Sequence, residues 1–232
     1  FVPETLSEVF SRNTNAEVFA LIESDLEKAE SFLKTQNNAT RVSLDFVKAL
    51  RTRMALYRGQ YNIAAPLAQE LLNDYPLANR TQYPNVFLDT DNAEVIFKLE
   101  RRRDDQFDFG GNGVSGIVAQ SRAGAKFAFT NVNNGAYFEI GRSLFNLFDT
   151  NDVRFDVNVA TSSVISPDYQ NAIDFRNEDI LYVNKYPGSE TRNLMNDLKV
   201  FRSSEMVLIL AEAAAISENI NGAANSTAAY NK

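Results

Sequence analysis

Residues 43–76 constrain the fold most, because their pattern predicts two helices joined by a tight turn. In the first helix, side chains at three- and four-residue steps share one face, namely Phe46, Ala49, Leu50, Arg53, Met54 and Tyr57. The second helix repeats the pattern with Tyr61, Ala64, Ala65, Ala68, Leu71 and Leu72. We expect Gly59 to end the first helix, because glycine readily adopts the left-handed conformation found at helix ends. Pro76 lies just past the second helix, where it cannot propagate it.

The turn and the second helix follow the second half of a tetratricopeptide repeat, while the first helix matches that repeat poorly. The positions that carry the pattern are Gly59, Tyr61, Ala64, Ala68, Leu72 and Pro76. The small side chains at positions 64 and 68 should let the two helices approach closely. A single hairpin cannot bury its own apolar face, so we expect further helices to pack against it.

The composition excludes several kinds of chemistry. The chain has 232 residues with no Cys and no His, so it cannot form disulfides, thiolate nucleophiles, Ser-His-Asp triads or the usual zinc sites. A net charge of -7 and a pI of about 4.8 argue against binding to nucleic acid or to anionic membranes. The longest apolar run, residues 206–211, is far too short to span a bilayer. No motif predicts a metal site or a cofactor.

Three segments outside the hairpin have clear helical or strand periodicity. Residues 15–34 predict an amphipathic helix with Asn15 as its N-cap and an apolar stripe of Val18, Leu21, Ile22, Leu26, Ala29 and Leu33. Residues 94–100 predict a strand with Val95, Phe97 and Leu99 on one face and Glu94, Lys98 and Glu100 on the other. Residues 198–216 are apolar nearly all round, which predicts a central, buried helix.

Three shorter segments carry weaker patterns. Residues 141–149 suggest a short helix, and residues 153–159 and 179–186 suggest two further strands. In the helix predicted over residues 198–216, Glu205 and Glu212 share a face. Backbone contacts or a pair with Arg202 explain these two acids better than a catalytic role.

The stretches between these elements are irregular. Residues 77–93 are irregular, and the sequence DTDNAE at 89–94 resembles the start of a calcium loop. Glu94 stands where such a loop needs glycine, so we expect a turn before a strand. Residues 101–136 contain the spacing G-x-G-x-x-G at Gly111, Gly113 and Gly116. The segment before it is too polar for the strand of a dinucleotide-binding fold, so we expect a long loop.

Five stretches, taken in order, resemble the SusD/RagB family of nutrient-uptake outer-membrane lipoproteins of Bacteroidetes. They span residues 22–33, 47–72, 92–100, 147–156 and 184–215. The last stretch is the most specific, because it resembles the family signature at Lys185-Tyr186, Asp197, Val200-Phe201-Arg202-Ser203-Ser204-Glu205 and Leu210-Ala211-Glu212-Ala213.

The resemblance implies a mainly α fold, in which tetratricopeptide-like helical hairpins carry a loop-rich part with a few short β-strands. It implies one SusD-like domain over residues 1–232, divided into repeat-like helices (15–76), a loop-rich insert (77–197) and a second, incomplete helical hairpin (198–232). By the same comparison, we expect the chain to be a piece of a longer protein. The family's N-terminal part with its lipid-bearing Cys and the end of the last hairpin have no counterpart here.

The resemblance also implies a function. Family members are lipid-anchored at the cell surface in the outer membrane and bind oligosaccharides or polysaccharides, or peptides in some cases. They work with a TonB-dependent, SusC-like porin and are not known as catalysts. The matching motifs belong to the scaffold, so they transfer no ligand-binding residue to this chain.

The residues themselves offer only weak candidates for a glycan site. Such a site needs aromatic faces and planar polar groups, and the chain has no Trp. The candidates in the irregular middle are Phe107, Phe109, Asn112, Asn131, Asn133, Asn134 and Tyr137, and loop packing or exposed turn positions explain most of them better. No ligand-binding residue is therefore assigned.

Two alternatives to a glycan-binding protein stay open. The hairpin alone would suit a tetratricopeptide-type scaffold that binds a protein or peptide. The many acidic residues would suit a carboxylate-based enzyme such as a glycoside hydrolase, but no spacing singles out a pair.

Overall fold

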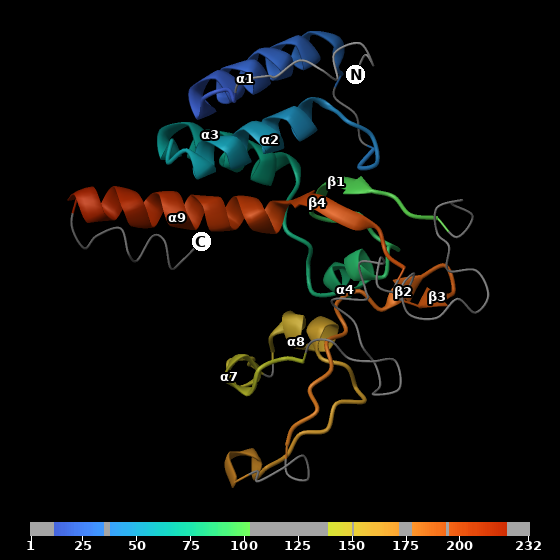
Figure 1. Ribbon diagram of the computed structural model, residues 1–232. Helices are drawn as coiled ribbons and strands as arrows, with labels where there is room; N and C mark the ends of the chain where they lie inside the picture. Colours follow the sequence, from blue (N-terminus) through green and yellow to red (C-terminus); the bar gives the residue numbers. More distant parts are fainter. Residues whose placement is uncertain are drawn as a thin grey trace.

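The computed structural model describes residues 12–34, 38–102, 139–149, 151–171, 178–193 and 195–221. Its helices stack at one end, and a loop-rich part with short helices lies at the other (Figure 1). The stacked helices are α1 (Asn15–Phe32), α2 (Leu44–Tyr57), α3 (Tyr61–Asp74) and α9 (Ser203–Asn221). The predicted mainly α fold with a few short strands is confirmed. The helix expected near the end of the chain falls outside the described residues.

The predicted hairpin is formed by α2 and α3, and local hydrogen bonds explain its ends. α2 begins at Ser43, whose hydroxyl accepts a hydrogen bond from the Phe46 amide at 3.3 Å. At its other end, the Gly59 amide donates to the Leu56 carbonyl at 2.9 Å and the Gln60 amide to the Ala55 carbonyl at 2.8 Å. Gly59 has a φ of 66°, as this Schellman arrangement requires. The predicted role of Gly59 is confirmed.

Small side chains let α3 pack closely against its neighbours. Ala64, Ala68 and Leu71 are fully buried on α3, which contacts both α2 and α9. The face that α9 buries contains Met206, Ile209 and Ala213, whereas Leu208 is 70% exposed. The prediction that α9 is buried all round is therefore wrong, because it buries one face only. The predicted close approach at positions 64 and 68 is confirmed.

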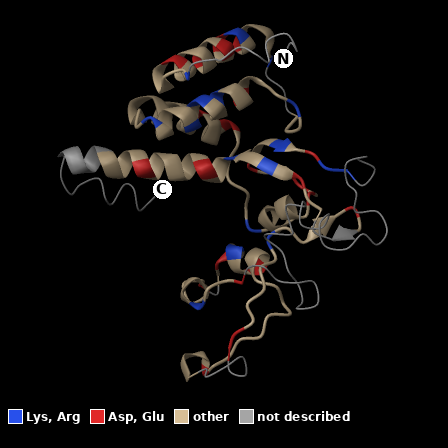
Figure 2. Ribbon diagram, viewed as in Figure 1, with Lys and Arg blue, Asp and Glu red and all other residues tan. Residues whose placement is uncertain are grey.

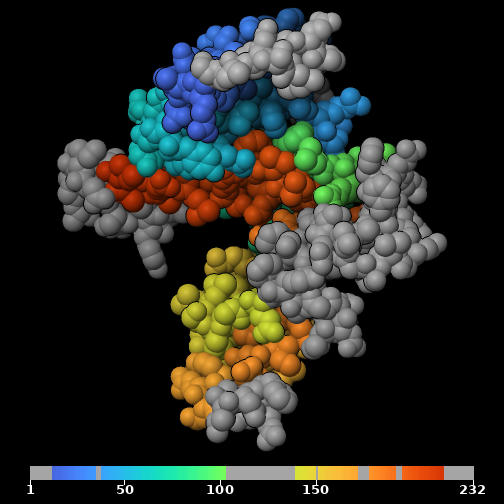
Figure 3. All heavy atoms as spheres, in the orientation of Figure 1, coloured from blue at the N-terminus to red at the C-terminus, as the bar shows by residue number. Residues whose placement is uncertain are grey.

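The stripe predicted for α2 is only partly correct. Tyr57 is 79% exposed, while Val47, Thr52 and Ala55 are buried although they lie outside the predicted stripe. The reason is that α2 contacts both α1 and α3, so it buries side chains on more than one face; in Figure 3, α1 lies above the layer that α2 and α3 form. A single stripe describes a helix that covers a core from one side.

α1 lies on the outside of the stack and is held mainly by polar contacts. Its N-cap is Thr14 and not Asn15, because the Thr14 hydroxyl accepts from the Glu17 amide while Glu17 accepts from the Thr14 amide. From the predicted stripe Leu26 is buried, but Val18 and Leu21 are 43% and 58% exposed. Arg51 of α2 forms ion pairs with Glu23 and Glu30 of α1.

One antiparallel pair of strands joins the two ends of the molecule. β1 (Val95–Leu99) pairs with β4 (Leu198–Arg202), so the helix predicted from residue 198 begins only at Ser203. β1 was expected to alternate, yet it is buried from Val95 through Lys98, and Leu99 is 51% exposed. Two irregularities in the register, between positions 95 and 97 and between 97 and 98, explain the lost alternation.

Aromatic side chains fill the space between this strand pair and α2. The ring of Phe46 meets Phe97 and Phe201 edge-on, with centroids 4.7 Å and 5.6 Å away. The three rings join the cluster that contains Ala64 and Leu71 of α3. The strand pair and the stacked helices therefore share one core.

Two short helices in the loop-rich part differ from the sequence predictions. α4 (Gln82–Phe87) was not expected in the irregular stretch, and α8 (Val153–Asn158) was predicted as a strand. The Asp152 carboxylate caps α8 by accepting from the Arg154 amide at 2.9 Å. The alternating apolar residues of α8 serve two clusters: Val157 packs with Phe87 of α4, and Phe155 packs with Val159 on the other side.

The remaining chain is mostly extended. The short helix expected within residues 141–149 is confirmed as α7 (Arg142–Phe145). The strand expected at residues 179–186 forms only isolated bridges, which pair Glu139 with Tyr182, Val159 with Val183 and Val164 with Ile180. A 3-10 turn, η3 (Tyr169–Asn171), and a small hairpin of β2 (Gly188–Ser189) and β3 (Arg192–Asn193) complete this part. Within the described residues, no helix could cross a bilayer.

Replacing Gly59 by alanine should lower the free energy of unfolding by about 1 kcal/mol, because a Cβ strains a residue with positive φ. The nearest heavy atom to an added Cβ is 3.9 Å away, so crowding contributes little. Gly141→Ala is the matched control, since Gly141 has an ordinary φ of -60° and the same clearance. Urea unfolding of both variants measures the effect. Equal stabilities would contradict the left-handed conformation at Gly59.

Replacing Tyr75 by phenylalanine should destabilise the hairpin in a pH-dependent way. The Tyr75 hydroxyl donates to the buried Asp45 carboxylate at 2.8 Å, a bond to a charged group worth about 1.5–3 kcal/mol. Burial, and then this bond, raise the pKa of Tyr75. The stabilisation is therefore full below the unfolded pKa of about 10 and is lost as the pH rises towards the folded value.

Urea unfolding at pH 7 and at two alkaline values tests this, with Tyr57→Phe at an exposed site as the control. The gap between the native protein and Tyr75→Phe should shrink as the pH rises above about 10. A gap that stays constant with pH would rule out the bond.

Candidate functional site

The segment with the strongest family signature builds a buried network of charges. Lys98 of β1 forms an ion pair with Asp197 at 2.7 Å, and Lys199 of β4 forms one with Asp89 in the turn after α4. The side chains of all four residues are less than a tenth exposed. Burial lowers the pKa of Lys199, and the hydrogen bond that its ammonium donates to the Asp89 carboxylate opposes that shift.

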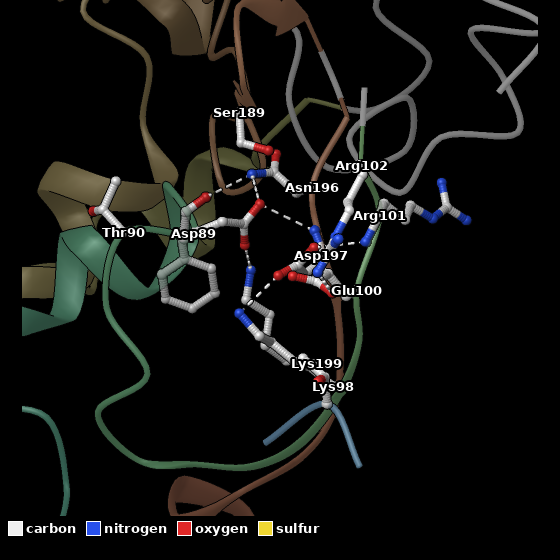
Figure 4. A network of polar contacts seen from close by, with 12 residues as sticks. Asp89, Thr90, Lys98, Glu100, Arg101, Arg102, Ser189, Asn196, Asp197 and Lys199 are labelled. Carbon is white, nitrogen blue, oxygen red and sulfur yellow. Dashed lines mark hydrogen bonds and ion pairs between the residues drawn. The ribbon is translucent and has the colours of Figure 1, made fainter. Parts of the chain in front are cut away.

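Hydrogen bonds satisfy the remaining polar atoms of this network (Figure 4). The Asn196 amide group donates to the Asp89 carboxylate at 2.8 Å, and its oxygen accepts from the Gly188 amide at 2.7 Å. The Asp197 carboxylate accepts from the Arg101 amide at 2.8 Å. The network therefore ties together the turn after α4, β1, β4 and the β2–β3 hairpin.

Asp89 and Glu94, from the segment that resembles a calcium loop, take part in structural contacts. Asp89 belongs to the network above, and Glu94 forms an ion pair with Arg202 at 2.8 Å. Both residues have positive φ values, as a tight turn requires, so the expected turn before β1 is confirmed. In the part of the chain that the structure describes, no group of three acidic side chains could hold a metal ion.

The two acids of α9 also have structural partners. The Glu205 carboxylate accepts two hydrogen bonds from the guanidinium of Arg53, at 2.7 Å and 2.6 Å. Glu212 accepts a hydrogen bond from the hydroxyl of Tyr61 at 3.0 Å. A structural role for both fits these contacts, but the partner predicted for them, Arg202, instead pairs with Glu94.

Figure 2 shows that charged residues are distributed along the chain in both parts of the molecule. Those at the strand pair are paired and buried, so they are poorly placed to bind a ligand. A candidate site must combine accessible polar groups with a cavity.

Replacing Lys98 by methionine should lower the free energy of unfolding by about 3–5 kcal/mol, because it leaves the buried charge of Asp197 without its partner. The control is Lys28→Met, which removes an ion pair with Asp25 between side chains that are 68% and 64% exposed. That change should have little effect, as surface pairs contribute little. Urea unfolding measures both, and equally small effects would show that the Lys98 pair is not buried.

A cleft of about 330 Å³ in the loop-rich part has the features of a binding site. Three separate segments form it: the approach to α7, the η3 turn and the extended segment near residue 180. The lining residues are Glu139, Ile140, Gly141, Arg142, Tyr169, Glu178, Asp179 and Leu181.

Arg142 is the centre of this cleft and is held in place from several sides. Its guanidinium donates to the Asp179 carboxylate at 2.7 Å and to the Ser166 carbonyl at 3.3 Å, and its Nε donates to Asn146 at 2.9 Å. The same Asp179 oxygen accepts from the Ser166 amide at 2.7 Å. The Arg142 and Asp179 side chains are 22% and 11% exposed, so their geometry is largely fixed.

The aromatic ring of Tyr169 lies against this guanidinium, which is 4.1 Å from the ring centroid. This cation-π contact helps to fix the orientation of a ring that belongs to a short turn. Below it, the buried Ile140 and Leu181 pack together, and the Ile140 amide donates to the Leu181 carbonyl at 2.9 Å. The cleft therefore has a firm apolar floor and preorganised polar walls.

These groups suit recognition of a ligand with many hydroxyl groups. An aromatic ring can cover the apolar face of a sugar, while carboxylate and guanidinium groups bond to its hydroxyls. Among the described residues that line the cleft there is no Ser, Thr, Lys or Cys, so the groups with chemical reactivity there are the carboxylates.

The sequence did not point to these residues. The seven aromatic and amide candidates considered from the sequence, and the G-x-G-x-x-G stretch, fall outside the described residues. Arg142, Tyr169 and Asp179 come from distant positions with no motif spacing, and only the bridges of the extended segments bring them together. The one usable signal was the presence of an aromatic residue among turn-forming residues near position 169.

Solved structures of other proteins resemble this chain along most of its length. One is a SusD superfamily protein from Bacteroides thetaiotaomicron, with a TM-score of 0.67, 22% identity, and coverage of 89% of this chain and 44% of that protein. A putative sugar-binding protein from Bacteroides vulgatus has a TM-score of 0.64 and 24% identity, with 97% and 46% covered.

A third is surface glycan-binding protein A from Bacteroides thetaiotaomicron, solved with laminarihexaose. Its TM-score is 0.60 at 18% identity, and the match covers 90% of this chain and 52% of that protein. No family model matches the chain, and no curated protein matches it. The chain spans about half the length of the proteins whose structures it resembles. The resemblance expected from the sequence is confirmed at the level of structure: this chain has the SusD-like fold.

Proposed function

We propose that this chain is part of a cell-surface glycan-binding protein that captures oligosaccharides or polysaccharides for nutrient uptake. The observation that carries the proposal is the cleft in which the ring of Tyr169 lies on a guanidinium held by Asp179. The SusD-like fold supports it, because one protein that shares the fold was solved with laminarihexaose. The ligand would lie with one sugar ring against Tyr169 and its hydroxyls towards the charged groups of the cleft.

The remaining features of the proposal are suggested by the resemblance to SusD-like proteins. The protein would be held at the outer membrane by a lipid anchor outside this chain and would deliver its ligand to a TonB-dependent, SusC-like porin. The described residues would form one domain, in which the helices and the strand pair support the cleft. The shared core of α2, α3, α9 and the strand pair favours a single unit.

A peptide-binding scaffold built on the hairpin is less well supported. The apolar face of α3, at Ala64, Ala68 and Leu71, is fully buried against neighbouring elements. A tetratricopeptide-type scaffold needs an open face for its ligand. We therefore place peptide binding second.

We also propose that the protein does not catalyse a reaction on its ligand. Arg142 and the Ser166 amide both bond to one oxygen of the Asp179 carboxylate, so this group is engaged in holding the cleft, and Glu139 and Glu178 are the carboxylates that remain for a catalyst. The absence of His and Cys removes other common catalysts. Incubation with a bound polysaccharide should release no reducing sugar, and measurable release would return a glycoside hydrolase to consideration.

The chain should bind at least one polysaccharide, and Tyr169→Ala should weaken that binding at least tenfold by removing the aromatic face. Affinity electrophoresis against laminarin, starch, xyloglucan and galactomannan, and against acidic polysaccharides, would find the ligand, and calorimetry would measure the affinity. Tyr57→Ala is the control, because Tyr57 is 79% exposed on the distant hairpin. Equal affinities for the two variants would place the site elsewhere, and no retardation by any polysaccharide would reject glycan binding by this chain.

A further inference from the structure

We propose that the cleft around Arg142 selects uncharged glycans and rejects those that carry carboxylate or sulfate groups. This inference rests on the proposed function, and it adds a class of ligand. It follows from the charges of the lining residues, which include three carboxylates, on Glu139, Glu178 and Asp179, and one cation, on Arg142. The lining therefore carries a formal charge of about -2 by this count.

Arg142, the one cation among the described residues that line the cleft, is already neutralised. The Arg142 guanidinium forms an ion pair with Asp179 at 2.7 Å, and both side chains are mostly buried. A second anion would have to compete with Asp179, whose carboxylate also holds the Ser166 amide. Arg142 can still donate a hydrogen bond to a hydroxyl, but it cannot balance the charge of an acidic sugar.

The two other carboxylates keep their charge available to the ligand. Glu139 and Glu178 each begin one of the lining segments, and both are exposed. Neither forms an ion pair with any described residue. An anionic group within about 6 Å of either would be repelled, and water screens that repulsion only in part at the wall of a cleft. Carboxylates accept hydrogen bonds from sugar hydroxyls, so the same two groups favour a neutral ligand.

The net charge of -7 adds a weaker, long-range repulsion of polyanions. Salt screens that contribution, because the Debye length is about 8 Å at physiological ionic strength. Repulsion by the cleft and repulsion by the charge of the whole chain can therefore be separated. Two variants that change the total charge equally, one in the cleft and one far from it, make this comparison.

The first test is calorimetry of the chain against neutral polysaccharides (laminarin, starch, xyloglucan and galactomannan) and anionic ones (polygalacturonate, alginate and heparin). Binding of a neutral polysaccharide, with anionic ones at least about tenfold weaker, would support the inference. Binding of an anionic polysaccharide as tight as that of any neutral one would overturn it and leave glycan binding intact. Binding of none would instead reject the proposed function, and the inference with it.

The second test uses one sugar backbone. The neutral polysaccharide that binds best is converted to a carboxymethyl derivative and to a hydroxyethyl derivative at equal substitution, so that the two differ in charge and hardly in size. The native chain should bind the carboxymethyl form at least about tenfold more weakly than the hydroxyethyl form. Equal affinities for the two forms would overturn the inference.

Two double variants then locate the discrimination. Glu139→Gln with Glu178→Gln should reduce the ratio between the two derivatives at least threefold, because it removes the unpaired charges of the cleft. The control is Glu27→Gln with Asp74→Asn, which changes the total charge equally at exposed sites on α1 and α3. The control should leave the ratio unchanged at 0.15 M salt. Equal changes in both variants would show that the discrimination comes from overall charge, and would overturn the role of the cleft.

Discussion

The pairing of β1 with β4 is the contact on which the other parts of the molecule depend. Each strand is preceded by one acid that pairs with a cation of the other strand: Asp197 with Lys98 of β1, and Glu94 with Arg202 of β4. All four side chains are largely buried. A shifted register would leave these charges in the core without partners, which is strongly unfavourable. The pairs therefore favour one register although two irregularities interrupt the hydrogen-bonded ladder.

From this strand pair, continuous packing leads to the candidate site. Val95 of β1 shares a cluster with Phe87 of α4 and Val157 of α8. Val159, two residues after Val157, packs in a second cluster with Ile140 and Leu181, which line the cleft. The stacked helices thus do not line the cleft. They support it through the short helices and the isolated bridges that connect the two parts. The cleft can then hold Arg142 and Tyr169 in place although both belong to short elements.

The sequence predicted those elements whose stability is local. The α2–α3 hairpin could be placed because its cap at Ser43 and its turn at Gly59 leave clear signals. The start of α9 could not, because residues 198–202 continue a helical pattern and become a strand only by pairing with β1. α8 was mistaken for a strand because its alternating residues face two clusters. The cleft was missed because its residues meet through contacts between segments that carry no shared motif.

The strand pair also affects how freely the loop-rich part can change. Leu99 and Leu198 are partners at one end of the ladder, so residues 100–197 leave and re-enter the scaffold at one point. The entropic penalty for closing such an excursion grows only with the logarithm of its length, by about 0.6 kcal/mol for each doubling. Insertions and deletions in those loops of the excursion that make no contact with the strand pair would hardly affect the stability of the scaffold. Evolution could thus exchange the segment that carries the candidate site while the helical framework stays unchanged.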